Sequence, residues 1–140
     1  MSEHKPIVIP FENRVVVDVD HTLIETGRFI SVEEFKENIN SYAFTKSSME
    51  GKTLIAPYYD GYKMLEPKEG VIAFVKSLKA RGYHVTVHSN NGYLWAYAIV
   101  VALELEPYVD LVCTKSSKCI DDSENFQHIV GSLIHPKELI

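Results

Sequence analysis

The stretch "VVVDVDHTL", Val15–Leu23, places three valines directly before an acid, with a second acid two positions later. A run of β-branched residues without polar alternation predicts a fully buried strand over 15–19, of the kind found in parallel sheets. Asp18 and Asp20 come at its carboxyl end. Acids at strand ends are also common as turn residues and helix caps. The stretch alone therefore leaves two interpretations open, a turn or a pair of acids that act together.

The chain beyond this stretch alternates between strand-like and helix-like patterns. Residues 70–80 carry apolar side chains at helical spacing, with Gly82 placed to end that helix. The other expected elements are strands over 83–89, 108–114 and 118–121 and an almost wholly apolar helix over 92–105. This alternation predicts an α/β fold with a parallel sheet.

Residues 31–65 fit the alternation poorly, and we expect them to form a flap or small β insertion over one end of the sheet. "SVEEFKENI" predicts a short helix with Ser31 as N-cap and Glu34 as its capping-box partner. Aromatic residues gather in this region, and a small core of their own is favoured over stacking on a substrate. They are Tyr42, Phe44, Tyr58, Tyr59 and Tyr62. Residues 1–140 are expected to form a single domain.

Length and charge narrow the classes of function. With 140 residues the chain has the size of one domain, and its net charge of −5 argues against a general nucleic-acid-binding surface. No apolar run approaches membrane-spanning length, and "MSEHKPIVIP" lacks the pattern of a signal peptide. A cytoplasmic location is therefore expected, with no membrane partner. Cys113 and Cys119 show no metal-ligand spacing and are expected to be reduced.

Polar residues follow each of the expected strands. They are Asp18 and Asp20, then Ser89 and Asn90, then Lys115, and finally Asp121 and Asp122. Ligands of open parallel sheets bind at the carboxyl ends of the strands, so these side chains are expected to converge. Asp121 and Asp122 also fit the start of a helix over 123–130, and Ser89 and Asn90 fit a helix N-terminus.

Four carboxylates in one crevice would repel one another unless a cation were bound. Oxygen ligands of this kind suit Mg²⁺, which also bridges phosphate oxygens. The ion and Lys115 would offset the negative field and admit a phosphate. One carboxylate could then attack phosphorus, while another could protonate the leaving oxygen and later activate water.

Four segments in order resemble the motifs of the haloacid dehalogenase superfamily. "VVVDVDHTL" resembles the first motif, a hydrophobic strand followed by Asp-x-Asp-x-Thr, and "VTVHSN" resembles the second. Lys115 resembles the third motif and "CIDD" the fourth. The resemblance covers most of the chain except roughly 31–65. It implies a three-layer, Rossmann-like parallel sheet with a small flap in place of a large cap domain.

The resemblance also implies a role for each matching residue. Asp18 would be the nucleophile and a Mg²⁺ ligand, and Asp20 would be the general acid/base, with its backbone carbonyl also reaching the metal. Ser89 and Lys115 would contact the phosphoryl group. Asp121 would be a further metal ligand, supported by Asp122. Thr22 would hold the turn in shape. Apart from the resemblance, His21, Thr22 and Asn90 are expected on the substrate side, although a solvent-facing turn residue is the favoured interpretation of His21.

Two departures from the family pattern stand out. His21 occupies a position that is usually glycine, which a histidine tolerates if the backbone there is not left-handed. The short spacing from Lys115 to Asp121 leaves Lys118 as an alternative for the lysine role.

The function expected from these residues is Mg²⁺-dependent phosphomonoester hydrolysis through an aspartyl-phosphate, on a small sugar phosphate or nucleotide. A polynucleotide 3′-phosphatase or a protein phosphatase is the alternative within this chemistry. A non-catalytic, metal-binding interaction module on the same fold is the alternative from another class. The apolar helix over 93–103 also offers a surface for self-association.

Overall fold

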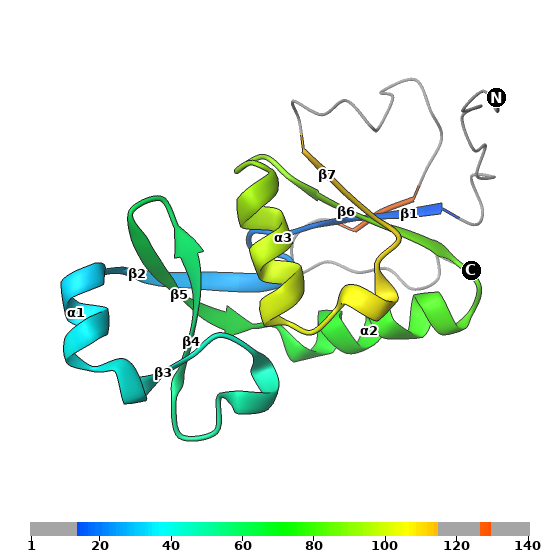
Figure 1. Cartoon of the computed structure of the whole chain (residues 1–140). Helices are drawn as coiled ribbons and strands as arrows, with labels where there is room; N and C mark the ends of the chain where they lie inside the picture. Colours follow the sequence, from blue (N-terminus) through cyan, green and yellow to red (C-terminus); the bar gives the residue numbers. More distant parts are fainter. Residues whose placement is uncertain (1–13, 115–126, 130–140) are drawn as a thin grey trace, which may run out of the picture.

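The computed structural model describes residues 14–114 and 127–129 and shows a mixed α/β fold with two four-stranded sheets (Figure 1). In chain order, the strands and α-helices are β1 (Arg14–Asp18), β2 (Ile24–Ser31), α1 (Val32–Glu37), β3 (Tyr42–Ala43), β4 (Thr53–Tyr58), β5 (Gly61–Pro67), α2 (Glu69–Ala80), β6 (His84–Ser89), α3 (Tyr93–Ala102), β7 (Leu111–Thr114) and β8 (Gln127–Ile129).

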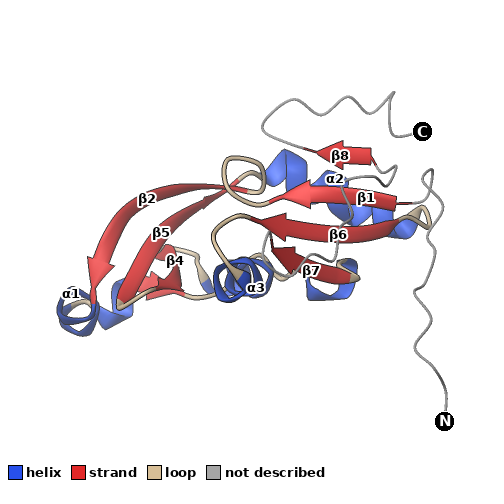
Figure 2. Ribbon diagram, turned by 90° about the horizontal axis from the view of Figure 1, so that it is seen from above, coloured by secondary structure: helices blue, strands red, loops and turns tan. Residues whose placement is uncertain are grey.

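The first sheet has the strand order β7-β6-β1-β8, and all its neighbours pair in parallel. β1 lies inside the sheet, and Val15, Val16 and Val17 are almost completely buried. The prediction of a fully buried strand is confirmed. Figure 2 shows the arrows of these strands pointing toward the second sheet, so their carboxyl ends lie on that side.

α2 confirms the helix expected over 70–80. It buries Val71, Ile72, Val75 and Leu78 on one side. Gly82 follows in a left-handed conformation (φ 88°), and its N–H donates to the Lys79 carbonyl at 3.0 Å. A glycine in this conformation is a common end to a helix, because it has no Cβ to crowd the turn.

α3 is shorter than the helix expected over 92–105. Trp95, Ala96, Ile99, Val100 and Ala102 are buried, whereas Leu94 is 86% exposed. The chain leaves the helix at Leu103, and Glu104 takes a left-handed φ of 57°. Leu103 and Leu105 remain buried in the same core, which explains why the apolar pattern continues beyond the helix.

Two expected elements differ from the structure. β7 begins at Leu111 rather than at residue 108, because Glu106–Tyr108 form a 3₁₀ turn that contains Pro107. Gln127–Ile129 form strand β8, so a helix over 123–130 is wrong at these residues. β8 pairs with the edge of β1 that β6 leaves unpaired, which satisfies backbone groups that would otherwise be buried without partners. The expected strand over 118–121 lies outside the described residues.

The second sheet is inserted between β1 and α2, begins at Ile24 and has the order β2-β5-β4-β3. Most of its pairing is antiparallel, and only the short β3 runs parallel to its neighbour β4. The Ser31 hydroxyl accepts the Glu34 N–H at 3.1 Å and caps α1, as expected. The Glu34 carboxylate instead pairs with Arg28, so the expected capping box is incomplete.

The five aromatic residues expected to form a small core in the insertion divide into two groups. Tyr42, Phe44 and Tyr62 pack around Phe35 of α1, with ring centroids 4.7–5.8 Å apart. This cluster is the small core expected for the insertion. Tyr58 and Tyr59 lie elsewhere: Tyr58 contacts α3, and Tyr59 is 90% exposed at the β4–β5 turn.

The insertion also packs onto the rest of the molecule. Leu54 and Ala56 of β4 belong to the same buried cluster as Trp95 of α3. At the surface, the Lys46 ammonium pairs with Glu69 at the start of α2, and the Ser47 N–H donates to the Glu104 carboxylate. Buried apolar contacts and polar contacts therefore both hold the insertion in place.

Cys113 of β7 is disulfide-bonded, so the expectation of a reduced thiol is wrong for this residue. Cys119 lies outside the described residues. In the part of the chain that the structure describes, we find no helix with the length and apolar character needed to cross a membrane.

Candidate functional site

The carboxyl edge of the first sheet brings together residues from three strands. Asp18 ends β1 and lies opposite His88 in the register, so Ser89 follows immediately on the neighbouring strand. Ser89 in turn lies opposite Thr114, the last residue of β7. The expected convergence of Asp18 and Ser89 at one sheet edge is therefore present in the structure.

The turn after β1 holds Thr22 against Asp18. The N–H groups of Thr22 and Leu23 both donate to the Val19 carbonyl, at 3.2 and 2.9 Å. The Thr22 side chain is fully buried, and its hydroxyl donates to Asp18 Oδ2 at 3.3 Å. Thr22 therefore contacts one oxygen of Asp18 from within the turn.

His21 has a left-handed backbone, with φ 64°, which contradicts the condition under which a histidine would fit easily. Its N–H donates to the Ile24 carbonyl at 2.8 Å, and its carbonyl accepts the Lys68 ammonium at 3.0 Å. These two hydrogen bonds hold the residue in a conformation that costs energy for any side chain with a Cβ.

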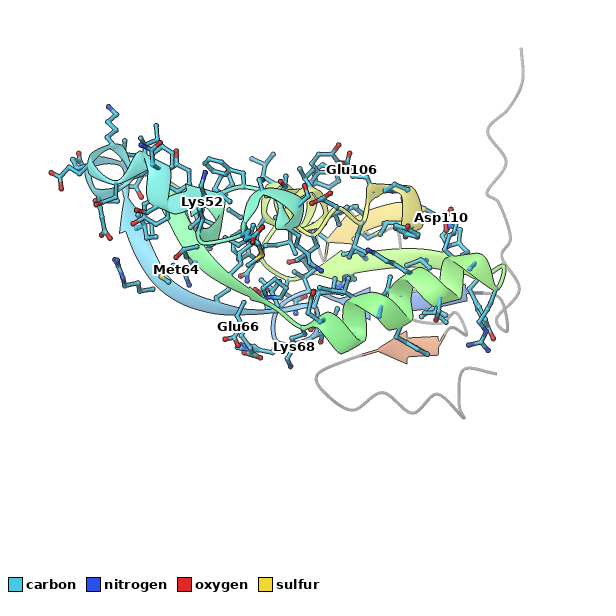
Figure 3. The ribbon with its side chains drawn as sticks, turned by 90° about the horizontal axis from the view of Figure 1, so that it is seen from below. Lys52, Met64, Glu66, Lys68, Glu106 and Asp110 are labelled. Atoms are coloured by element: carbon cyan, nitrogen blue, oxygen red, sulfur yellow. The ribbon has the colours of Figure 1, made fainter. Side chains whose placement is uncertain are left out.

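The His21 side chain is 73% exposed and pairs with Glu25, Nδ1 to Oε2, at 2.8 Å. The hydrogen bond that the Glu25 carboxylate accepts, reinforced by its charge, raises the pKa of His21. The same hydrogen bond lowers the pKa of Glu25, and Lys68 adds to that effect from 3.4 Å. Figure 3 shows Lys68 beside the start of α2, where β5 ends. The imidazole is thus hydrogen-bonded to a carboxylate near the start of β2.

Asp20 is held by two residues that the sequence analysis did not include in the site. The Asn91 side-chain amide donates to Oδ2 at 2.9 Å, and the Trp95 indole N–H donates to Oδ1 at 3.1 Å. Asn91 lies in "SNNG", a typical turn sequence, and Trp95 follows the apolar periodicity of a helix. Neither pattern distinguishes a site residue from a structural one.

Ser89 is fully buried, and its Oγ accepts the Asn91 N–H at 3.0 Å. The loop after β6 thus links Ser89 to the residue that contacts Asp20. Asn90, expected on the substrate side, is exposed in this loop. Asn91 therefore links the hydroxyl of Ser89 to the carboxylate of Asp20, while the carboxylate of Asp18 accepts the hydroxyl of Thr22.

The remaining expected site residues, Lys115, Lys118, Asp121 and Asp122, lie outside the described residues. Among the residues described, no group of three or more His, Cys, Asp or Glu side chains could hold a metal ion. The described part of the site thus supplies two carboxylates, those of Asp18 and Asp20.

A separate groove of about 350 Å³ runs between α3 and β7. Its lining residues are Tyr93, Tyr97, Val100, Glu106, Val109, Asp110, Leu111 and Val112. None of the residues expected in the site lines it, so it offers no evidence about that site.

The arrangement around β1 gives the two acids different surroundings. One Asp18 oxygen accepts a neutral hydroxyl, whereas both Asp20 oxygens accept N–H donors. Different hydrogen bonding allows neighbouring carboxylates to serve different roles.

No family model matches the chain, and comparisons with curated proteins and with solved structures found no significant match.

Proposed function

We propose that this protein is a phosphomonoester hydrolase in which Asp18 is the nucleophile and Asp20 the general acid/base. The observation that carries the proposal is the position of Asp18 at the carboxyl end of an interior parallel strand, beside Ser89, with Asp20 held by N–H donors two residues later. We propose the haloacid dehalogenase type of three-layer, Rossmann-like fold as its framework, supported by the four sequence motifs.

In the first step an Asp18 oxygen would attack phosphorus, and the bond from phosphorus to the leaving oxygen would break. The electron pair of that bond stays on the leaving oxygen, which takes a proton from Asp20. In the second step Asp20 removes a proton from water, whose oxygen attacks phosphorus. The bond to Asp18 then breaks, which releases phosphate and restores Asp18 as a carboxylate and Asp20 as a protonated acid.

Carboxylate and carbonyl oxygens are the ligands that Mg²⁺ prefers in proteins, and we propose this ion as the cofactor. The Asp18 carboxylate and the Asp20 backbone carbonyl would hold it, together with Asp121 and Asp122. We propose the backbone carbonyl of Asp20 for this role because both of its side-chain oxygens accept N–H donors. When bound, the ion would offset the negative charge of a phosphate.

A small sugar phosphate or nucleotide is the substrate that we favour. The net charge of −5 supports this choice over a nucleic-acid substrate, which would bind better to a basic surface.

Self-association through α3 stays a prediction, for which the exposed Tyr93, Leu94 and Tyr97 are the relevant surface. A cytoplasmic location also stays a prediction, and a disulfide at Cys113 is uncommon in that compartment.

The proposal is tested by hydrolysis of para-nitrophenyl phosphate and a panel of phosphorylated sugars and nucleotides, with Mg²⁺ or with excess EDTA. We expect turnover that requires Mg²⁺ and that Asp18→Asn abolishes. Asp110→Asn is the matched control, because Asp110 bonds to the N–H of Val85 near the opposite edge of the sheet. Circular dichroism of each variant shows whether the fold is retained.

Full activity in a folded Asp18→Asn protein would disprove the assignment of the nucleophile. Absence of phosphate release from every compound of the panel, with wild-type protein and Mg²⁺, would contradict the proposed reaction. Calorimetric titration with Mg²⁺ then separates the two classes of function. Binding of the ion without turnover would favour a metal-binding interaction module.

A further inference from the structure

The carboxylate of Asp20 is fixed from two directions. Asn91 donates to Oδ2 from the loop after β6, and Trp95 donates to Oδ1 from the first turn of α3. An indole N–H can only donate, so Trp95 is the donor and Asp20 the acceptor in this contact. Trp95 is 5% exposed, whereas Asn91 is exposed. The buried indole is therefore the more rigid of the two supports.

The position of the indole depends on the insertion. Tyr58, the last residue of β4, meets the Trp95 ring edge to face, with centroids 5.1 Å apart and planes at 79°. This geometry is favourable for aromatic pairs. The Lys63 ammonium lies 4.6 Å from the centroid of the Tyr58 ring and covers it from β5. A chain of contacts thus runs from the insertion through Tyr58 and Trp95 to Asp20.

We infer that Trp95 is a positioning residue for Asp20, and that Tyr58 of the insertion holds Trp95 in place. This inference rests on the proposed function. Each carboxylate oxygen has a second lone pair, so Asp20 can carry a proton while it accepts the indole N–H. Holding the carboxylate at one angle would direct that proton at the leaving oxygen.

The inference concerns the step in which the leaving group departs. An alkoxide is a poor leaving group and needs a proton from Asp20. A para-nitrophenolate leaves without one, because its negative charge is delocalised. Misplacing Asp20 should therefore lower kcat/KM, which reports the steps up to departure of the leaving group, for alkyl phosphates and spare it for para-nitrophenyl phosphate. A general loss of structure would slow both reactions equally.

The test compares kcat/KM of Trp95→Phe for glycerol 2-phosphate and for para-nitrophenyl phosphate, with Mg²⁺ present. General acid catalysis contributes about 100-fold or more to such reactions, and we expect this variant to lose at least about tenfold on the alkyl substrate. On the aryl substrate we expect kcat/KM to fall by less than about threefold, since its leaving group departs without a proton. Tyr97→Phe is the matched control on the same helix, because its hydroxyl contacts Glu106 and not Asp20.

Two further variants keep the test decisive if Trp95→Phe folds poorly. Asn91→Ala removes the other N–H donor from an exposed position and should show the same selective loss. Tyr58→Leu removes the ring that supports Trp95, and we expect a smaller loss of the same kind. Equal losses on both substrates in folded variants would overturn the positioning role.

The failure of the inference can be told apart from the failure of the proposed function. A wild-type protein that hydrolyses both substrates, combined with variants of unchanged substrate ratio, overturns the inference alone. A wild-type protein that hydrolyses neither substrate overturns both.

Discussion

Lys68 donates from its ammonium to the His21 carbonyl at 3.0 Å, and its backbone N–H donates to the Leu23 carbonyl at 2.9 Å. One residue at the end of β5 thus closes two hydrogen bonds on the turn that follows β1. The turn that carries Asp20 is therefore anchored to the start of α2 as well as to its own strand.

Replacing His21 tests whether this anchoring holds a strained backbone. A left-handed φ costs a residue with a Cβ about 1 kcal/mol relative to glycine. We therefore expect His21→Gly to unfold at a higher urea concentration than His21→Ala, since both variants lose the contact with Glu25. Equal unfolding midpoints would show that the turn relaxes out of the left-handed region.

The second prediction concerns Gly61 at the start of β5. A Cβ at this position would clash with the Phe29 ring and would lie 2.5 Å from the Ile30 carbonyl oxygen. The backbone of β2 cannot move away without breaking its pairing with β5, so Gly61→Ala should lower the free energy of unfolding by about 1–3 kcal/mol.

The control for this substitution is Gly70→Ala in the first turn of α2, where nothing lies within 4 Å of the added Cβ. Alanine favours helices over glycine by about 1 kcal/mol, so this variant should be unchanged or more stable. Urea denaturation measures both variants. A Gly61→Ala protein as stable as the control would mean that the hairpin has more room than the structure shows.

The third prediction concerns the pH dependence of stability at Asp110. Burial alone would raise the pKa of this carboxyl, but hydrogen bonds from Lys79 and from the Val85 N–H outweigh it, so the pKa is lowered. A lowered folded-state pKa stabilises the fold above the unfolded-state value and loses this contribution as the pH falls through the folded-state value.

Asp110→Asn should therefore reduce the unfolding free energy at neutral pH, and the difference from wild type should shrink below the ordinary pKa of 3.8. Urea denaturation between pH 7 and pH 2.5 measures it. A difference that stays constant over this range would exclude the ionised carboxylate as its source.

The fourth prediction concerns the docking of the insertion. The Glu104 carboxylate accepts the Ser47 N–H, and this hydrogen bond lowers the pKa of Glu104. Glu104→Ala should speed hydrogen exchange at the Ser47 amide, because its acceptor is lost. Glu106→Ala, nearby on the surface, should leave that amide unchanged. Unaltered exchange at Ser47 in both variants would show that other contacts protect it.

Sequence patterns identified the elements whose periodicity reflects burial. Val15–Val17 predicted the interior strand, and the spacing of Val71, Val75 and Leu78 predicted α2. The insertion was harder to predict, because β2, β4 and β5 form a sheet with partly buried strands whose pairing is set by long-range register. The short strand β8 was not predicted. Its three residues are too few to show a periodic pattern, and they lie within a segment that also fits a helix.

The residues of the candidate site also divide into those that the sequence could locate and those that it could not. Asp18, Asp20 and Ser89 could be located because they directly follow apolar strands. Asn91 and Trp95 could not, because their contact with Asp20 joins residues 71 and 75 positions apart. A hydrogen bond of this kind depends on the way in which α3 packs against the turn, and no local pattern encodes it.

The parallel pairing of β1 with β6 also has a consequence for the order of folding. The two strands are separated by the whole insertion and α2, residues 19–83, so the chain must close this long loop before Asp18 and Ser89 become neighbours. Pairings of such high sequence separation form slowly. The hairpin of β4 and β5 can form locally and earlier, so the sheet edge that carries Asp18 and Ser89 should be completed among the last events of refolding.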